Sequence, residues 1–202
     1  MSRVAGYRPR RLDLLRRATF RSARRMYGSS LEPTRIVAHH KPLLLGYSAV
    51  ALAQNRFSRS VPVRLKELGM LRAAQLMGCE WCLDFGSRLA ADAGVPEEDL
   101  RALAVWRSSE RFDDVDRLVL EYAEAMTRTP VAVPEELVAA LRERFDSRQL
   151  VELTMSIALE NLYSRFNWAL GIESEGFSEG TYCVRPETAD LSNPLEAVSG
   201  AR

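Results

Sequence analysis

Apolar residues recur every three or four positions along most of this chain, which is the spacing of amphipathic helices. We find no convincing alternation typical of strands, and no Asn-Gly or Asp-Gly pair typical of tight hairpins. The pattern therefore predicts an all-α fold of about eight helices. The predicted helices occupy about 12–26, 41–54, 62–78, 80–93 and 147–170, and three further helices begin near residues 96, 113 and 134.

Residues that favour helix ends support these boundaries. Asp113 and Asp146 can accept hydrogen bonds from the first free N–H groups of the helices that follow them. Gly78, Gly94 and Gly171 come where the periodic pattern stops, as glycine often does after a helix.

The chain of 202 residues is long enough to bury one sizeable core, and it shows no internal repeat, low-complexity tract or clear linker. We expect a single helical domain over residues 31–172. Residues 1–30 form a basic N-terminal arm or helix in this interpretation, and the glycine- and proline-containing residues 173–202 form an irregular, partly mobile tail.

Formal net charge is +1, so the overall balance favours neither nucleic acid nor an acidic substrate. Arginines nevertheless crowd residues 1–25, where Asp13 is the sole acid. Because the apolar face of this segment is weak, it favours an oligomer contact or a solvated arm over a membrane or nucleic-acid partner.

Apolar residues near the start are too scattered for a secretory signal. The most apolar stretch, residues 42–52, is too short to cross a bilayer. We therefore expect a cytoplasmic location, where two cysteines at close spacing indicate redox or metal chemistry.

Those cysteines lie in the run Gly78-Cys79-Glu80-Trp81-Cys82, where one predicted helix ends and the next begins. In the first turn of a helix, a spacing of three brings both sulfurs to one face. The free N–H groups and the positive end of the helix dipole there lower the pKa of a thiol, and thiolate is the nucleophile toward peroxides and disulfides. The pair is thus a candidate for reversible disulfide chemistry.

Two other interpretations of the pair stay open. The cysteines can be small buried hydrophobic residues, or ligands of a structural metal, although zinc usually takes four ligands and no second pair lies at suitable spacing. Cys183, in the tail, can be a further ligand, a resolving thiol or incidental, and we favour incidental.

Residues 64–82, which run from Arg64-Leu65-Lys66-Glu67 to the two cysteines, resemble the carboxymuconolactone decarboxylase and alkylhydroperoxidase D superfamily. There, a Glu about three helical turns upstream precedes Gly-Cys-x-x-Cys at the next helix. Residues 112–129, the run Val133-Pro134-Glu135-Glu136 and residues 150–171, with Asn161, Arg165 and Asn167, are also similar, so the resemblance covers roughly residues 40–172. It implies a helical bundle of the alkylhydroperoxidase D type that forms homo-oligomers.

The resemblance also implies roles for three residues. Cys82 corresponds to the thiol that attacks peroxide, Cys79 to the resolving thiol that exchanges with the reductant, and Glu67 to an acid in a proton relay. The resemblance implies that no cofactor is bound. It also implies a dithiol reductant, which in related peroxidases is a lipoylated protein.

One departure from the family pattern matters chemically. The related peroxidases carry a His four residues after the second cysteine, and often another between the cysteines, where this chain has Gly86 and Trp81. A group of near-neutral pKa helps to deprotonate the thiol, so Glu67 must act alone or through water here.

Four residues are possible accessory groups. Asp84 can substitute for the missing base, although a solvated helix position is the simpler interpretation, and Trp81 can pack over the thiols or belong to the core. His39 and His40 can approach the cysteines in the fold, although a place at a helix start is simpler. For Arg165 we expect a buried ion pair with a partner other than Glu160.

The leading hypothesis is a thiol-dependent peroxidase or disulfide oxidoreductase acting on a small peroxide or disulfide. A second is a non-catalytic, redox-responsive binding protein, which the missing histidines favour. A third is a cofactor-free lactone decarboxylase, which is disfavoured because decarboxylases of the superfamily generally lack the cysteine pair.

Overall fold

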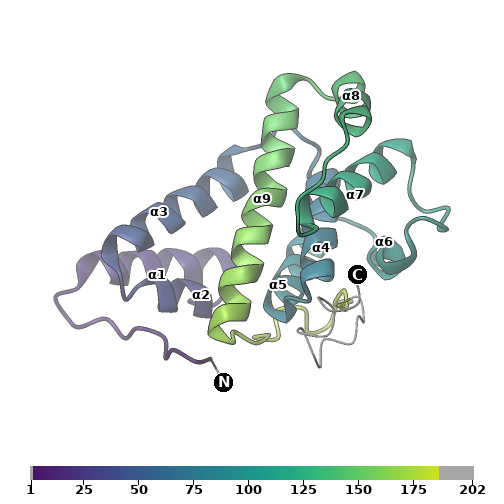
Figure 1. Ribbon diagram of the computed structural model, residues 1–202. Coiled ribbons are helices and arrows are strands. Elements are labelled where there is room, and N and C mark those ends of the chain that lie inside the picture. Colours follow the sequence, from purple (N-terminus) through teal and green to yellow (C-terminus); the bar gives the residue numbers. More distant parts are fainter. Residues whose placement is uncertain (1, 187–202) are drawn as a thin grey trace, which may run out of the picture.

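The computed structural model describes residues 2–186, and within them it consists of α-helices, one π-helical turn and one 3-10 turn, without strands (Figure 1). The α-helices are α1 (Leu14–Tyr27), α2 (Glu32–Val37), α3 (Lys41–Leu52), α4 (Val63–Met77), α5 (Glu80–Asp92), α6 (Glu97–Ala102), α7 (Asp114–Thr127), α8 (Glu135–Arg144) and α9 (Ser147–Leu170). The π-helical turn η1 (Ala53–Phe57) extends α3, and the 3-10 turn η2 (Leu103–Val105) extends α6.

The predicted all-α fold is confirmed, and each predicted helix is present with ends shifted by a few residues. The sequence pattern missed α2. That helix has only six residues, too few to show periodicity, and its N-terminal neighbour Leu31 offers no capping side chain. Glu32 and Pro33 in its first turn are the start signal that could have found it.

The expected helix ends are confirmed in detail. Asp113 and Asp146 each form a capping box with the residue three positions later. Gly78 and Gly171 adopt left-handed backbone conformations and close α4 and α9. The turn at Gly78 reverses the chain, so that α5 begins at the buried end of α4.

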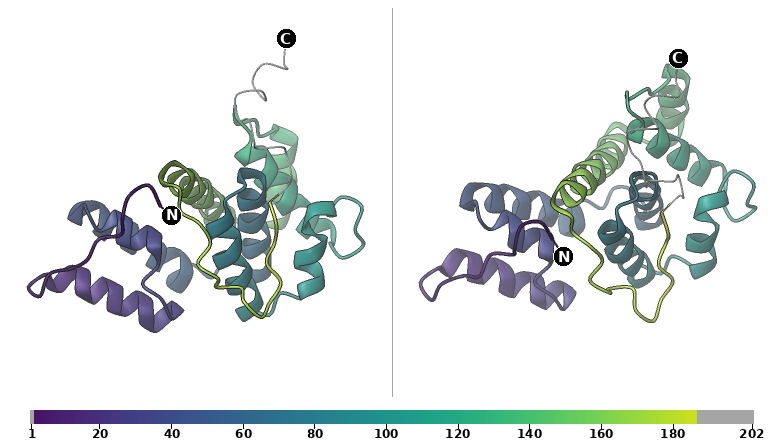
Figure 2. Two further views of the ribbon diagram at one scale, coloured as in Figure 1. Left: turned by 90° about the horizontal axis from the view of Figure 1, so that it is seen from below. Right: turned by 60° about the horizontal axis from the view of Figure 1, so that its bottom comes forward.

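Helix α4 lies at the centre of the molecule and packs against α5, α7 and α9. Figure 2 shows α4 and α5 between α9 on one side and α6 and α7 on the other. Residues on every side of α4 are buried, including Leu68, Lys66 and Arg72, so this helix buries more than the one apolar face of an amphipathic helix.

The two buried cations of the central helix, Lys66 and Arg72, are paired. The Arg72 guanidinium lies 2.7 Å from the Glu124 carboxylate on α7. Burial raises the pKa of Glu124, but hydrogen bonds from Arg107 and Trp106 and the charge of Arg72 outweigh it and lower the pKa to about 2. Glu124 is therefore an ionised structural anchor.

Helices α1, α2 and α3 lie on the opposite side of α9 from α7 and α8 (Figures 1 and 2). Phe20, Ala38 and Leu44 form a small core between them. Buried Arg16 donates hydrogen bonds to the Ala38 carbonyl and to Asp13. Helix α1 is thus packed in place, and the domain boundary near residue 30 stays a prediction.

None of the described helices combines the length and apolar character needed to cross a bilayer.

Gly69 lies where α4 packs tightly against α7 and α9, since a Cβ there would lie 3.2 Å from Val119 and 3.5 Å from Ile157. We predict that Gly69→Val lowers the free energy of unfolding by roughly 2 kcal/mol or more, because the added methyl groups overpack this crossing. Gly46→Ala on exposed α3, where nothing lies within 4 Å of a new Cβ, is the control. It should raise stability by about 0.5–1 kcal/mol through helix propensity. Equal effects in urea unfolding would contradict this account.

Candidate functional site

The cysteine pair forms the first turn of α5, as the sequence predicts. Cys79 is the N-cap residue, and its sulfur accepts a hydrogen bond from the Cys82 backbone N–H at 3.3 Å. The two residues are joined by a disulfide with a Cα–Cα distance of 5.3 Å. Both side chains are buried. The pair is therefore able to close a disulfide without rearranging the helix.

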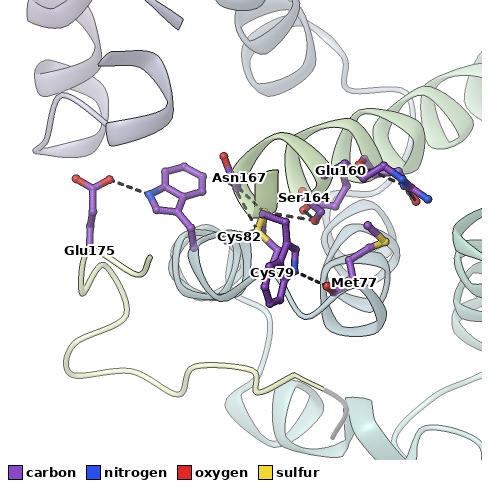
Figure 3. The surroundings of a disulfide bond; sticks show 11 residues. Met77, Cys79, Cys82, Glu160, Ser164, Asn167 and Glu175 are labelled. Atoms are coloured by element: carbon purple, nitrogen blue, oxygen red, sulfur yellow. Dashed lines mark hydrogen bonds between the residues drawn. A yellow bond between two sulfur atoms is a disulfide. The ribbon is translucent and has the colours of Figure 1, made fainter. Parts of the chain in front are cut away.

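Helix α9 supplies the polar atoms that face the two sulfurs (Figure 3). Asn167 Nδ2 lies 3.3 Å from Cys82 Sγ and 3.6 Å from Cys79 Sγ, and Ser164 Oγ lies 3.5 Å from Cys82 Sγ. Donors at these positions stabilise a thiolate on either sulfur. Trp168 Nε1 also donates to the Met77 carbonyl at 2.6 Å and ties α9 to the end of α4 just before the cysteines.

Two buried carboxyl groups lie close to this turn. Burial raises the pKa of Glu67 to about 7, opposed by the charge of Lys66. Burial also raises the pKa of Glu160 to about 7, where a hydrogen bond from Ser164 lowers it and the neighbouring Glu67 raises it again. Each carboxyl can therefore gain or lose a proton near neutral pH.

A cavity of about 410 Å³ opens beside Cys82. Its walls come from α1, α3, η1, α4, α5 and α9 and are mostly apolar, and Glu67, Glu160, Tyr47 and Tyr163 also line it. Burial raises the pKa of Tyr163 to about 12, and its hydroxyl has no hydrogen-bond partner among the described residues. Cys82, but not Cys79, lines this space, so a small molecule in the cavity would lie against Cys82.

Trp81 belongs to an aromatic cluster next to the thiols. Its ring stacks on Phe85, with centroids 4.9 Å apart, and its Nε1 donates to Glu175 at 2.8 Å. The indole is buried and lines the cavity. Trp81 is therefore a core residue that also lines the cavity, and its packing over the thiols stays a prediction.

Asp84 is not solvated, so the simpler sequence interpretation of this residue is wrong. Its carboxylate is buried and accepts hydrogen bonds from the backbone N–H groups of residues 175–178 and from the hydroxyls of Ser174 and Ser178. Burial raises its pKa, but these bonds outweigh burial and lower it. Asp84 is therefore a poor proton acceptor that anchors residues 174–178, the segment called the strap below.

The segment that follows α9 is packed against the domain, in contrast to the partly mobile tail that the sequence suggested. Residues 173–186 contain no helix, as predicted, yet Ser178 and Val184 are buried, and Val184 N–H donates to Ser87. Expectations for residues 187–202 lie outside the described residues. Cys183 is half-buried and in no disulfide, and its incidental role stays a prediction.

His39 and His40 lie at the start of α3, where the simpler interpretation placed them. Both are exposed, His39 contacts the Ala5 carbonyl, and His40 Nδ1 accepts from Leu43 N–H. Neither contacts the cysteines or lines the cavity. At the position of the family His, a Cβ on Gly86 would lie 3.0 Å from Leu71. A side chain at this position would therefore have to displace the end of the Leu71 side chain slightly, beside the cavity that Gly86 also lines.

The α9 residues around the thiols were only partly predicted. Asn167 was singled out by resemblance, whereas Ser164 was not, and Glu160 was considered only as a poor partner for Arg165. The spacing of 160, 164 and 167 puts three polar residues on one buried face of α9, which is the signal that could have found them. The buried ion pair expected for Arg165 is wrong, because this side chain is exposed and bonds to Asn161 and Thr129.

Among residues 2–186 no three His, Cys, Asp or Glu side chains come together in a way that could hold a metal ion.

Comparisons with known proteins identify the family of this chain. The profile of the carboxymuconolactone decarboxylase family matches residues 45–125. An uncharacterized protein, YnjA of Escherichia coli K12, is 36% identical over 159 residues, which are 76% of this chain and 84% of that protein. The chain belongs to the carboxymuconolactone decarboxylase family.

Solved structures show that the fold is shared more widely. The debrominase Bmp8 superposes with a TM-score of 0.75 at 18% identity, over 88% of this chain and 94% of that one. An uncharacterized peroxidase-related protein from Silicibacter superposes with a TM-score of 0.72 at 16% identity, over 81% and 86%. At these identities the likeness establishes the fold alone.

The raised pKa of Glu67 has a consequence for stability. The folded chain keeps a proton that the unfolded chain releases above its usual pKa near 4.5, so the free energy of unfolding falls as pH rises from about 4.5 to about 7. We predict that the Glu67→Gln protein loses roughly 3 kcal/mol less of its free energy of unfolding than wild type over this pH range. Glu121→Gln, on the exposed side of α7, should leave the pH dependence unchanged. Parallel stability curves for Glu67→Gln and wild type would contradict a buried neutral Glu67.

Asp84→Asn should loosen the strap, because an amide nitrogen in place of one carboxylate oxygen cannot accept hydrogen bonds. Oδ2 now accepts from the N–H groups of residues 175–177 and Oδ1 from Ser178 N–H, so one of these two sets loses its acceptor. We predict a loss of about 3 kcal/mol in the free energy of unfolding, together with protease cleavage near residue 176. Asp92→Asn is the control, since Asp92 lies on the same helix and forms only an exposed pair with Arg88. An Asp84→Asn protein as resistant to proteolysis as the control would be inconsistent with this anchoring role.

Proposed function

We propose that this protein is a thiol-dependent peroxidase and disulfide oxidoreductase that acts on apolar organic hydroperoxides. The observation that carries the proposal is the placement of Cys82, whose sulfur lines an apolar cavity while it is bridged to Cys79. A cavity of about 410 Å³ can hold an organic group, which hydrogen peroxide does not require.

The chemistry follows from the two sulfurs. Cys82 thiolate attacks the hydroperoxide oxygen, the O–O bond breaks, and an alcohol leaves as Cys82 becomes a sulfenic acid. The Cys79 thiol then condenses with it, releasing water and closing the disulfide. An external dithiol, such as a lipoylated protein, returns the pair to its reduced state.

Self-association and a cytoplasmic location are two further predictions that fit this function. Exposed apolar side chains on α3 and α9, among them Leu43, Leu45, Met155 and Leu162, favour self-association. A cytoplasmic location would keep the thiols reduced between turnovers.

The test is peroxide consumption by purified protein with cumene hydroperoxide and a dithiol. Cys82→Ser and Cys79→Ser should each abolish turnover, because one removes the nucleophile and the other the resolving thiol. Cys183→Ser is the matched control, since Cys183 is outside the disulfide, and it should keep wild-type turnover.

The other outcomes separate the alternatives. A disulfide that forms and reverses without turnover would favour a redox-responsive binding protein. Peroxide loss that is indifferent to both cysteines would reject the thiol mechanism and leave the lactone decarboxylase to be assayed.

A second candidate function rests on the same cavity. The debrominase Bmp8, a fold relative, has also been solved as a cysteine-to-alanine variant in complex with 2,3,4-tribromopyrrole. Replacing bromine by hydrogen takes two electrons, which a thiol pair supplies as it closes its disulfide. Bromide release from tribromopyrrole with reduced protein, lost in Cys82→Ser, would favour this candidate over the peroxidase.

A further inference from the structure

Ser164 connects the attacking sulfur to a buried acid. Its hydroxyl lies 3.0 Å from Glu160 Oε1 and 3.5 Å from Cys82 Sγ, and Glu160 and Ser164 are one helical turn apart on α9 (Figure 3). All three side chains are buried, Ser164 completely. A serine hydroxyl can accept one hydrogen bond while it donates another, so this arrangement can pass a proton.

We propose that Glu160 exchanges a proton with Cys82 through the Ser164 hydroxyl, and that these two residues perform the task of the histidines missing at positions 81 and 86. The inference rests on the proposed function for the direction of the second proton transfer.

The first transfer activates the thiol. In the reduced protein the Cys82 S–H donates to Ser164 Oγ, and the Ser164 O–H donates to the Glu160 carboxylate. When both protons shift along these bonds, Cys82 becomes a thiolate and Glu160 a neutral acid. The total charge of the site is unchanged, so the transfer avoids adding a charge to a dry interior.

The second transfer runs the other way. The thiolate electron pair forms the S–O bond as the O–O bond breaks, and the departing alkoxide needs a proton. Neutral Glu160 supplies it through Ser164, which yields the alcohol, the Cys82 sulfenic acid and a Glu160 carboxylate. Atoms and charge balance without another reactant.

The surroundings of Glu160 suit this exchange. The titratable groups that face it are Glu67 on α4, Tyr47 on α3 and Tyr163 on α9 itself. The nearby Lys66 is paired with Glu152 and does not contact Glu160. A raised pKa of about 7 brings Glu160 close to the usual thiol value of about 8.5, so neither transfer is strongly uphill.

Glu67 is less directly connected than Glu160. It lines the same cavity, but hydrogen bonds between described residues do not link it to either sulfur. Glu67 therefore influences Cys82 indirectly, because its charge raises the pKa of Glu160.

The experiment compares two reactions of the same sulfur in a Cys79→Ser, Cys183→Ser background, where Cys82 is the remaining thiol and serine preserves the N-cap. Iodoacetamide alkylation needs a thiolate but releases iodide, which takes no proton. Cumene hydroperoxide needs the thiolate and also a proton on the leaving oxygen. Rates of both reactions are measured from pH 5.5 to 9.

Glu160→Gln and Ser164→Ala should each slow the hydroperoxide reaction about a hundredfold, while alkylation slows by less than about tenfold. Ser156→Ala is the matched control, because Ser156 is equally buried on α9 but bonds to the Glu152 carbonyl. It should change neither rate. Equal slowing of both reactions in the two variants would show that the leaving oxygen takes no proton from Glu160, and would overturn the proposal.

The relay and the peroxidase can fail separately. If the parent protein does not react with hydroperoxide, the proposed function fails, and ultraviolet absorbance of the Cys82 thiolate decides the relay. The titration should shift in both Glu160→Gln and Ser164→Ala, since each alters the partner with which the thiol shares its proton. Titrations that overlay the parent would rule the relay out.

Discussion

The site depends on the contact between the first turn of α5 and the polar face of α9. Gly78 reverses the chain, Cys79 caps α5, and Ser164 and Asn167 place their polar atoms against the sulfurs. Because this contact is buried, the sulfurs and their donors interact in a low-dielectric environment where hydrogen bonds to a thiolate are strong. Deep placement of the turn thus surrounds a common cysteine motif with hydrogen-bond donors that would stabilise a thiolate.

The same burial explains the chemistry of the acids. Glu67 and Glu160 have raised pKa values because they are desolvated without a cationic partner in direct contact, whereas Glu124 and Asp84 are held ionised by arginines or backbone N–H groups. The ionised carboxylates of Glu124 and Asp84 therefore hold the structure together, whereas Glu67 and Glu160 can exchange protons near neutral pH.

Much of the fold was predictable because it follows local rules. Periodicity placed most helices, and aspartate and glycine marked their ends, but α2 is too short to show periodicity and has no capping side chain at Leu31. The cysteine turn was also predictable, since helix start and spacing are local. The roles of Glu160, Ser164 and Asp84 were not, because each depends on which distant segment packs against it, and spacing alone does not reveal burial.

Redox equilibrium of the Cys79–Cys82 pair tests the central claim most directly. Protein held at a series of dithiol-to-disulfide ratios is quenched with acid and alkylated, and its thiols are counted by mass spectrometry. A reactive pair under α9 should pass between dithiol and disulfide in one reversible two-electron step, with the same curve from either direction. A pair that stays locked in one state across the whole range, while Cys183 alone responds, would contradict the account.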